Sequence, residues 1–135
     1  MGEKAVIDIL EDKSGNFWCQ AGNGILYFDT KSRKFTRITA NPKETDGLLS
    51  NYGNHTFLLD KSGTLWFGVA MEGVQWINRQ RSGFIQYGNN PGAIHYFPGG
   101  AVQGFAKSAD GAIWIGAQHG LYHWQPQTDS FTQIK

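Results

Sequence analysis

The chain has 135 residues, of which 40% are hydrophobic and 17% charged, and its formal net charge is +1. This length suggests one domain, and the apolar fraction is too high for general disorder. The near-neutral charge gives no electrostatic case for binding nucleic acid or an anionic membrane surface. No apolar run approaches the roughly 20 residues of a membrane span, so we expect no membrane contact by this segment.

The first 39 residues predict four short strands joined as a meander. β-branched residues predict a strand over residues 5–10. Asp12-Lys-Ser-Gly15 has turn chemistry, because an aspartate side chain accepts backbone N–H bonds and glycine tolerates positive φ. Residues 17–21 are apolar or small without alternation, which is typical of a strand buried on both faces. The remaining turns and strands are predicted at residues 22–24, 25–29, 30–34 and 35–39.

The same pattern occurs three times, with tryptophans 48 residues apart and a glycine three residues before each: Gly15 and Trp18, Gly63 and Trp66, Gly111 and Trp114. A fixed period in this range indicates a repeat architecture, for which these residues form the structural core. A four-stranded unit that is apolar on both faces is typical of a β-propeller blade. We therefore expect an all-β partial propeller over residues 1–135, with three four-stranded antiparallel blades at about 5–39, 54–88 and 102–135.

The repeat resembles the two-component regulator propeller repeat, whose pattern is Asp-x-x-Gly-x-Leu-Trp-Ile-Gly-Thr followed by a glycine-rich turn and Gly-Leu. Asp60-Lys-Ser-Gly-Thr-Leu-Trp-Phe-Gly-Val69 is close to it, as is Ser108-Ala-Asp-Gly-Ala-Ile-Trp-Ile-Gly-Ala117. Gly47-Leu-Leu-Ser-Asn51 looks like the segment that often precedes such a blade. The departures are Ser108 in place of aspartate, no threonine after the glycine, and Cys19-Gln20 in place of Ile-Gly. The resemblance covers nearly all of the chain.

The resemblance implies a periplasmic or other extracytoplasmic sensor domain of a hybrid two-component histidine kinase. In that family the propeller binds or relays a signal without chemistry, often in bacteria that use complex glycans, and the kinase segments lie far downstream. None of those segments occurs in these 135 residues. The N-terminal Met-Gly-Glu-Lys has no apolar signal region, so we expect no export signal on this chain.

No converging catalytic set is evident, and we expect no catalysis, no cofactor and no metal site. His119 and His123 are four residues apart, but across a turn rather than on a helix. Asp12 and Asp60 occupy equivalent turns of different blades, where turn capping is the expected role. Cys19 is expected to be a small buried apolar residue. The basic turn residues are expected to form a solvated rim: Lys13, Lys31, Arg33, Lys34, Lys61, Arg79 and Arg81.

The opposite rim, with the glycine turns and long joining segments, is rich in amides and aromatics. Such groups suit a neutral polyhydroxylated ligand, for example an oligosaccharide. Because the first strand of a blade lines the axis and joining loops carry specificity, the candidate ligand-binding residues are Tyr52, His55, Tyr96, Gln103 and His119. The alternative is that the asparagines and glycines of this rim only serve turn geometry.

Two other functional hypotheses remain open. A propeller lyase of the antibiotic-cleaving type would need His55, His95 or His119 to converge with an acid such as Glu72. A purely structural segment would only contribute blades to a larger ring. Three blades fall short of the usual four to eight. We therefore expect further propeller blades or self-association to close a ring, either as two copies with six blades or as a longer natural ring.

Overall fold

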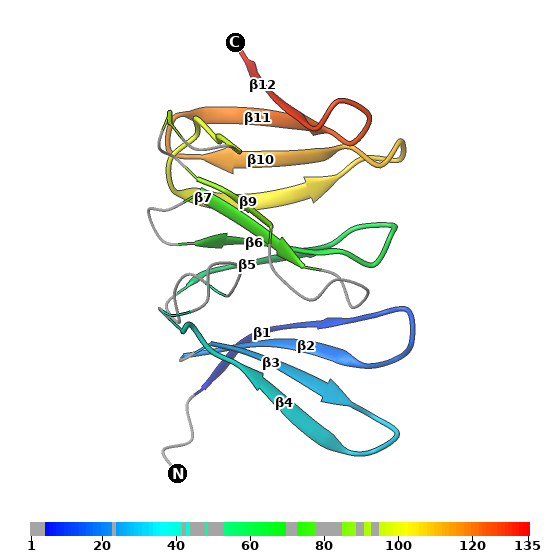
Figure 1. Cartoon of the computed structure of the whole chain (residues 1–135). Coiled ribbons are helices and arrows are strands. Elements are labelled where there is room, and N and C mark those ends of the chain that lie inside the picture. Colours follow the sequence, from blue (N-terminus) through cyan, green and yellow to red (C-terminus); the bar gives the residue numbers. More distant parts are fainter. Residues whose placement is uncertain are drawn as a thin grey trace.

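The computed structural model is all-β and confirms the predicted fold class, with three four-stranded antiparallel sheets stacked along the chain (Figure 1). It describes residues 5–22, 24–41, 43, 48, 53–69, 73–77, 85–88, 91–92 and 95–135, without the side chains of residues 53–55 and 69. None of the described residues belongs to a helix that is long and apolar enough to cross a membrane.

Each sheet is a meander in which strands adjacent in sequence pair with each other, and each sheet is one blade. Blade 1 consists of β1 (Val6–Glu11), β2 (Phe17–Ala21), β3 (Gly24–Asp29) and β4 (Lys34–Ile38). Blade 2 consists of β5 (Gly53–Leu59), β6 (Leu65–Val69), β7 (Gly73–Ile77) and β8 (Ile85–Tyr87). Blade 3 consists of β9 (Val102–Lys107), β10 (Ile113–Ala117), β11 (Gly120–Gln125) and β12 (Ser130–Ile134).

The turn between the first and second strands of each blade is built as the repeat motif predicts. Gly15, Gly63 and Gly111 have φ of 78°, 86° and 88°, a region that side-chain-bearing residues rarely adopt. Asp60 Oδ1 accepts the backbone N–H groups of Ser62 and Thr64 at 2.9 and 3.0 Å. Asp12 makes the same two contacts in blade 1, so the turn-capping role expected for both aspartates is confirmed.

Where blade 3 has Ser108 instead of aspartate, the cap moves by two residues. Asp110 Oδ1 accepts the N–H of Ala112 at 3.1 Å and the hydroxyl of Ser108 at 2.8 Å. These donors hold the pKa of the Asp110 carboxyl below its usual value, the Ala112 N–H contributing most. The third turn therefore keeps a carboxylate cap despite the substitution.

The three blades share one orientation. The β1–β2, β5–β6 and β9–β10 turns all lie at the same end of the stack, on the right in Figure 1, and we call this end the turn rim. The opposite end, where the chain passes from one blade to the next, is the joining rim. The first strands β1, β5 and β9 lie beside one another across the blades, as expected for strands that line a propeller axis.

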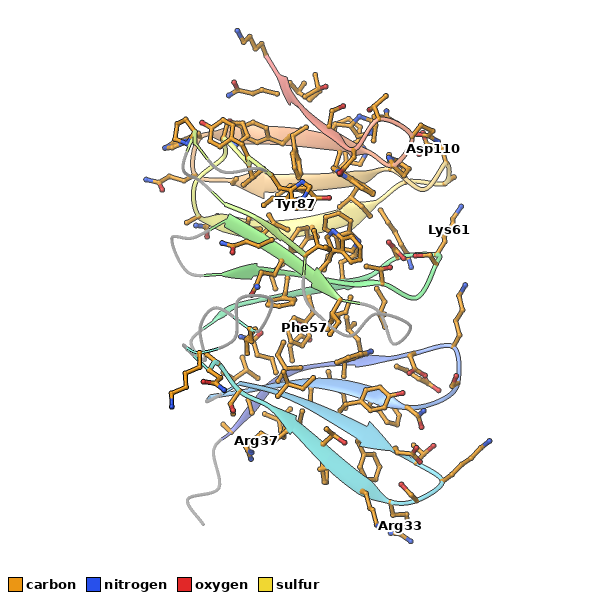
Figure 2. All side chains as sticks on the ribbon, viewed as in Figure 1. Arg33, Arg37, Phe57, Lys61, Tyr87 and Asp110 are labelled. Carbon is orange, nitrogen blue, oxygen red and sulfur yellow. The ribbon has the colours of Figure 1, made fainter. Side chains whose placement is uncertain are left out.

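Blades 1 and 2 are joined by an apolar layer. The register of paired strands places Leu10, Trp18 and Tyr27 on one face of blade 1. These residues pack with Leu65 and Phe67 of blade 2, and Trp18 is only 1% exposed. Phe57, labelled in Figure 2, lies between the two sheets. The apolar residues on this face of blade 1 are thus buried because the sheet of blade 2 covers it.

Blades 2 and 3 meet through a larger aromatic cluster. Trp66, 1% exposed, contacts Trp124 edge to face with ring centroids 4.6 Å apart. Tyr87 stacks parallel to Trp66 at 6.2 Å and meets Phe131 edge to face at 4.9 Å. Edge-to-face and offset ring pairs add stabilisation beyond the burial of apolar area. This junction therefore carries a large part of the core.

The third repeat tryptophan departs from the expected core position. Trp114 is half-buried, whereas Trp18 and Trp66 are almost completely buried. Its main ring contact is His123 of the same blade, at 4.3 Å. The physical reason is its place on the face of blade 3 that no other described sheet covers. Cys19, by contrast, is buried as expected, and that burial raises the pKa of its thiol.

Replacement of Trp66 by alanine should lower the free energy of unfolding by about 3–5 kcal/mol, because it removes the central ring of the junction between blades 2 and 3. Chemical denaturation measures this loss directly. The matched control is Lys31→Ala on the exposed β3–β4 turn, which should change stability by less than about 0.5 kcal/mol. A loss below about 1 kcal/mol for Trp66→Ala would contradict its place between two blades.

Candidate functional site

A cleft of about 310 Å³ lies between the outer strands of blades 2 and 3. The predicted ligand-binding residue Tyr96 lines it and is 40% exposed. Backbone bonds hold Tyr96 there: Gly88 N–H donates to the His95 carbonyl at 2.9 Å and Phe97 N–H to the Gly88 carbonyl at 2.8 Å. The segment before β9 thus pairs with the chain just after β8. The other lining residues are Tyr87, His95, Pro98, Asp129, Ser130 and Phe131.

The floor of this cleft, which we call the Tyr96 cleft, is a hydrogen-bonded group that crosses the blade junction. The Tyr87 hydroxyl donates to Asp129 Oδ1 at 2.5 Å, and Trp124 Nε1 donates to the same oxygen at 2.9 Å. Asp129 sits in the β11–β12 turn with φ of 48°. Burial, together with the Asp129 carboxylate, raises the pKa of Tyr87 well above its ordinary value of 10.0. The hydroxyl is therefore a fixed, neutral donor near neutral pH.

His119 lies at the joining rim beside the same segment. Its backbone N–H donates to the Gly99 carbonyl at 3.0 Å, and its ring Nδ1 is 3.0 Å from the Pro98 carbonyl oxygen. Pro98 also lines the Tyr96 cleft. The structure thus brings two of the predicted site residues, Tyr96 and His119, to one short segment of backbone.

The other predicted site residues lie elsewhere or outside the described structure. Gln103 is exposed on β9, and its carbonyl accepts the Thr56 hydroxyl of β5 at 3.1 Å. It does not line the Tyr96 cleft. His55 lies on β5 next to Thr56, but its side chain is not among those described, and Tyr52 is outside the described residues. Gln103 and the backbone of His55 therefore belong to the inner strands, away from Tyr96.

Sequence reasoning missed the contribution of Asp129. Its partner Tyr87 is 42 residues earlier, in another blade, so no local motif links them. The one available signal was its position in the β11–β12 turn, which corresponds to Arg33 in the β3–β4 turn. Both residues adopt the left-handed conformation, with φ of 48° and 57°.

The arrangement does not assemble a recognisable catalytic group from the described residues. His95 meets Tyr87 edge to face at 5.5 Å, and His119 binds backbone. Glu72 and the His55 side chain, which the lyase hypothesis needs, fall outside the described part of the chain. Among the described histidines, cysteine and acids, no group of three could hold a metal ion.

A second cleft, of about 260 Å³, opens on the turn rim between blades 2 and 3. Trp66, Trp76 and Trp124 line it, and each indole N–H is already bonded within the protein: to Asp60 Oδ2 at 3.0 Å, to the Tyr87 hydroxyl at 3.3 Å and to Asp129 Oδ1 at 2.9 Å. The rings therefore offer apolar contact rather than hydrogen bonds to anything that enters.

The basic side chains of the turn rim that the structure describes are exposed, as expected for Lys13, Lys31, Arg33, Lys34 and Lys61, while Arg79 and Arg81 lie outside the described residues. Two of the exposed lysines also make hydrogen bonds between blades. Lys13 Nζ donates to the Lys61 carbonyl, and Lys61 Nζ donates to the Ala109 carbonyl. Figure 2 shows Lys61 and Asp110 at this same rim. Each lysine ties its turn to the equivalent turn of the next blade. Sequence reasoning missed these bonds because they depend on how neighbouring repeats are aligned in space.

Comparison with known proteins supports the fold. No protein-family model and no curated protein matches the chain. Among solved structures, it is similar to the extracellular domain assigned to the hybrid two-component system BT4673 from B. thetaiotaomicron, with 18% identity and a TM-score of 0.70 over 99% of this chain and 20% of that chain. The corresponding domain of BT3049 gives 17% identity and a TM-score of 0.62, over 98% of this chain and 24% of that chain.

A third similar structure is virginiamycin B lyase from Staphylococcus aureus, with 18% identity and a TM-score of 0.68, over 100% of this chain and 42% of that chain. The chain thus spans about a fifth to a quarter of the sensor domains and less than half of the lyase. At these identities the likeness establishes the propeller fold that the three share with this chain.

The buried Tyr87 hydroxyl predicts a specific loss of stability at alkaline pH. A tyrosine in the unfolded chain ionises near pH 10.0, while folded Tyr87 keeps its proton. The protonated Tyr87 hydroxyl therefore contributes fully to the free energy of unfolding below about pH 10, and this contribution is lost as the pH rises further. Between about pH 10 and 12 the wild type should lose about 1.4 kcal/mol per pH unit more than Tyr87→Phe. The free energy of unfolding of both proteins is measured by denaturation at several pH values. If it falls equally for the wild type and Tyr87→Phe, Tyr87 is not buried beside Asp129.

Proposed function

We propose that this chain is a non-catalytic, ligand-binding segment of an extracytoplasmic sensor propeller, and that its ligand is an oligosaccharide or another small neutral molecule. The observation that carries the proposal is the Tyr96 cleft on a fold shared with extracellular domains of two-component systems. The sensor role and extracytoplasmic location draw on that fold likeness and on the repeat motif.

The chemistry of the cleft favours a neutral polyhydroxylated ligand. Tyr96 offers a half-exposed aromatic ring, against which the apolar face of a sugar can stack. His95 and Ser130 add polar groups around it. Asp129 supplies a carboxylate, a strong acceptor for hydroxyl donors. A rigid two-blade scaffold beneath a joining segment is also where binding residues concentrate in other folds.

Binding to a glycan array, followed by calorimetry on any ligand found, tests the proposal. Tyr96→Ala should weaken affinity by about 1–3 kcal/mol, since stacking and a hydrogen bond are lost together. Tyr96→Phe keeps the ring and should lose less. Loss of the His55 side chain should also weaken binding if the ligand reaches the inner strands.

Lys31→Ala, on the exposed β3–β4 turn of blade 1 and outside the cleft, is the control and should leave affinity unchanged. A ligand whose binding Lys31→Ala weakens, while Tyr96→Ala and His55→Ala do not, would place the binding site away from the Tyr96 cleft. That outcome would overturn the proposed site.

The alternative is a propeller lyase, favoured by the fold likeness to virginiamycin B lyase and by the presence of both His95 and Asp129 in the lining of the cleft. A pH–rate profile on cyclic lactone substrates separates the two functions. Turnover that His95→Ala or His119→Ala abolishes would establish the enzyme and exclude the sensor proposal in its non-catalytic form.

A further inference from the structure

The two ends of the blade stack expose apolar sheet faces. The strand register places six apolar residues on the open face of blade 1, with the charged Glu11 and Arg37 at its margins: Ile9, Phe17, Cys19, Leu26, Phe28 and Phe35, of which Cys19 is buried. Ile9 is 55% and Phe35 62% exposed. The open face of blade 3 carries Ala106, Trp114, Leu121, His123 and Ile134, with Leu121 43% and Ile134 45% exposed. Soluble monomers rarely expose apolar patches of this kind without a partner.

Each sheet has one face that bears the repeat tryptophan and one face that does not, and the two open faces are of opposite kind. The two junctions within the chain show how these two kinds of face pack together. In each internal junction, the face that bears the repeat tryptophan packs on the other face of the next blade: Trp18 on Leu65 and Phe67, then Trp66 on Ile113 and Ile115. The open face of blade 3 bears Trp114. The open face of blade 1 is the type that receives a tryptophan.

We propose that the open face of blade 3 docks on the open face of blade 1 of a second copy, and that two copies close head to tail into a six-bladed ring. The contact continues the junction that already joins blades 1 to 2 and 2 to 3. A head-to-tail contact made twice forms a closed pair when the rotation fits. Six blades lie within the range of about four to eight in which propellers close.

Repeat positions predict the contacts in this new junction. Trp66 meets Trp124, whose strand partner is Ile113. In blade 1 the equivalent position is Phe28, paired with Phe17. Trp114 should therefore lie against Phe28 of the second copy.

The outer strands give a second predicted contact in the same way. Tyr87 meets Phe131 in the internal junction. The strand register makes Ile134 the counterpart of Tyr87, and Phe35 the counterpart of Phe131. Ile134 should therefore lie against Phe35 of the second copy.

The junctions within the chain each contain a hydrogen bond from a lysine to a carbonyl of the next blade, and the proposed junction between copies lacks its equivalent. Lys13 and Lys61 each donate to a carbonyl of the next blade, but the equivalent position in blade 3 is Ala109. Alanine has no donor to contribute. The junction between copies should therefore be weaker than those within a chain, and the assembly should depend on protein concentration.

Light scattering on the full chain tests the proposal. The wild type should give about 30 kDa, twice the 15.0 kDa chain. Leu121→Glu and Phe35→Glu each place a charge in the new junction and should raise the dissociation constant at least about tenfold. Both residues are exposed in the single chain, so the variants should stay folded by circular dichroism. Lys31→Glu, on an exposed turn, should remain dimeric.

A mixture of the two variants tests the head-to-tail geometry. In a mixed pair one junction carries both glutamates, while the other joins an unchanged Leu121 face to an unchanged Phe35 face. Mixing should therefore restore part of the 30 kDa species, about twice the chain mass. A clean 15.0 kDa wild-type particle, larger open oligomers, dissociation by only one of the variants, or no recovery on mixing would each overturn the proposal.

Discussion

The structure depends on one constraint: each sheet is apolar on both faces, so each must be covered on both sides. A sheet that alternated apolar and polar residues could face water on one side. The central strands, such as β6 with Leu65, Trp66 and Phe67, do not alternate, and all three residues are buried. Stacking like sheets, each turned about a common axis, satisfies this need. The constraint also accounts for the half-buried Trp114 at the end of the stack.

Polar contacts at the turn rim and at the outer strands fix the sheets relative to one another. Capped turns hold each hairpin, and the Lys13 and Lys61 side chains join neighbouring turns. On the outer side, the Tyr87–Asp129 bond crosses from blade 2 to blade 3. The same bond forms the floor of the Tyr96 cleft. The candidate site therefore rests on a junction between blades.

The features that recur in every blade could be predicted from the sequence, whereas the contacts between blades could not. The period of Trp18, Trp66 and Trp114 revealed three blades, and Asp60 was correctly expected to cap its turn. Tyr96 was expected near the axis with Gln103, but backbone pairing of Gly88 with residues 95–97 carries it to the outer strands. That pairing leaves no periodic signal. Contacts between blades likewise join residues about one repeat apart, which local patterns do not reveal.

The central claim is that blades 2 and 3 are held together by aromatic rings meeting across their junction. A double-mutant cycle on Trp66 and Trp124, with each replaced by leucine, measures that contact directly. The rings meet edge to face at 4.6 Å, so we expect a coupling energy of about 0.5–1.5 kcal/mol in the free energy of unfolding. The control pair is Trp66 and Phe28; because Phe28 lies on the open face of blade 1, away from Trp66, their effects should be additive within about 0.5 kcal/mol. Additivity of Trp66 and Trp124 would contradict the stacked-blade arrangement.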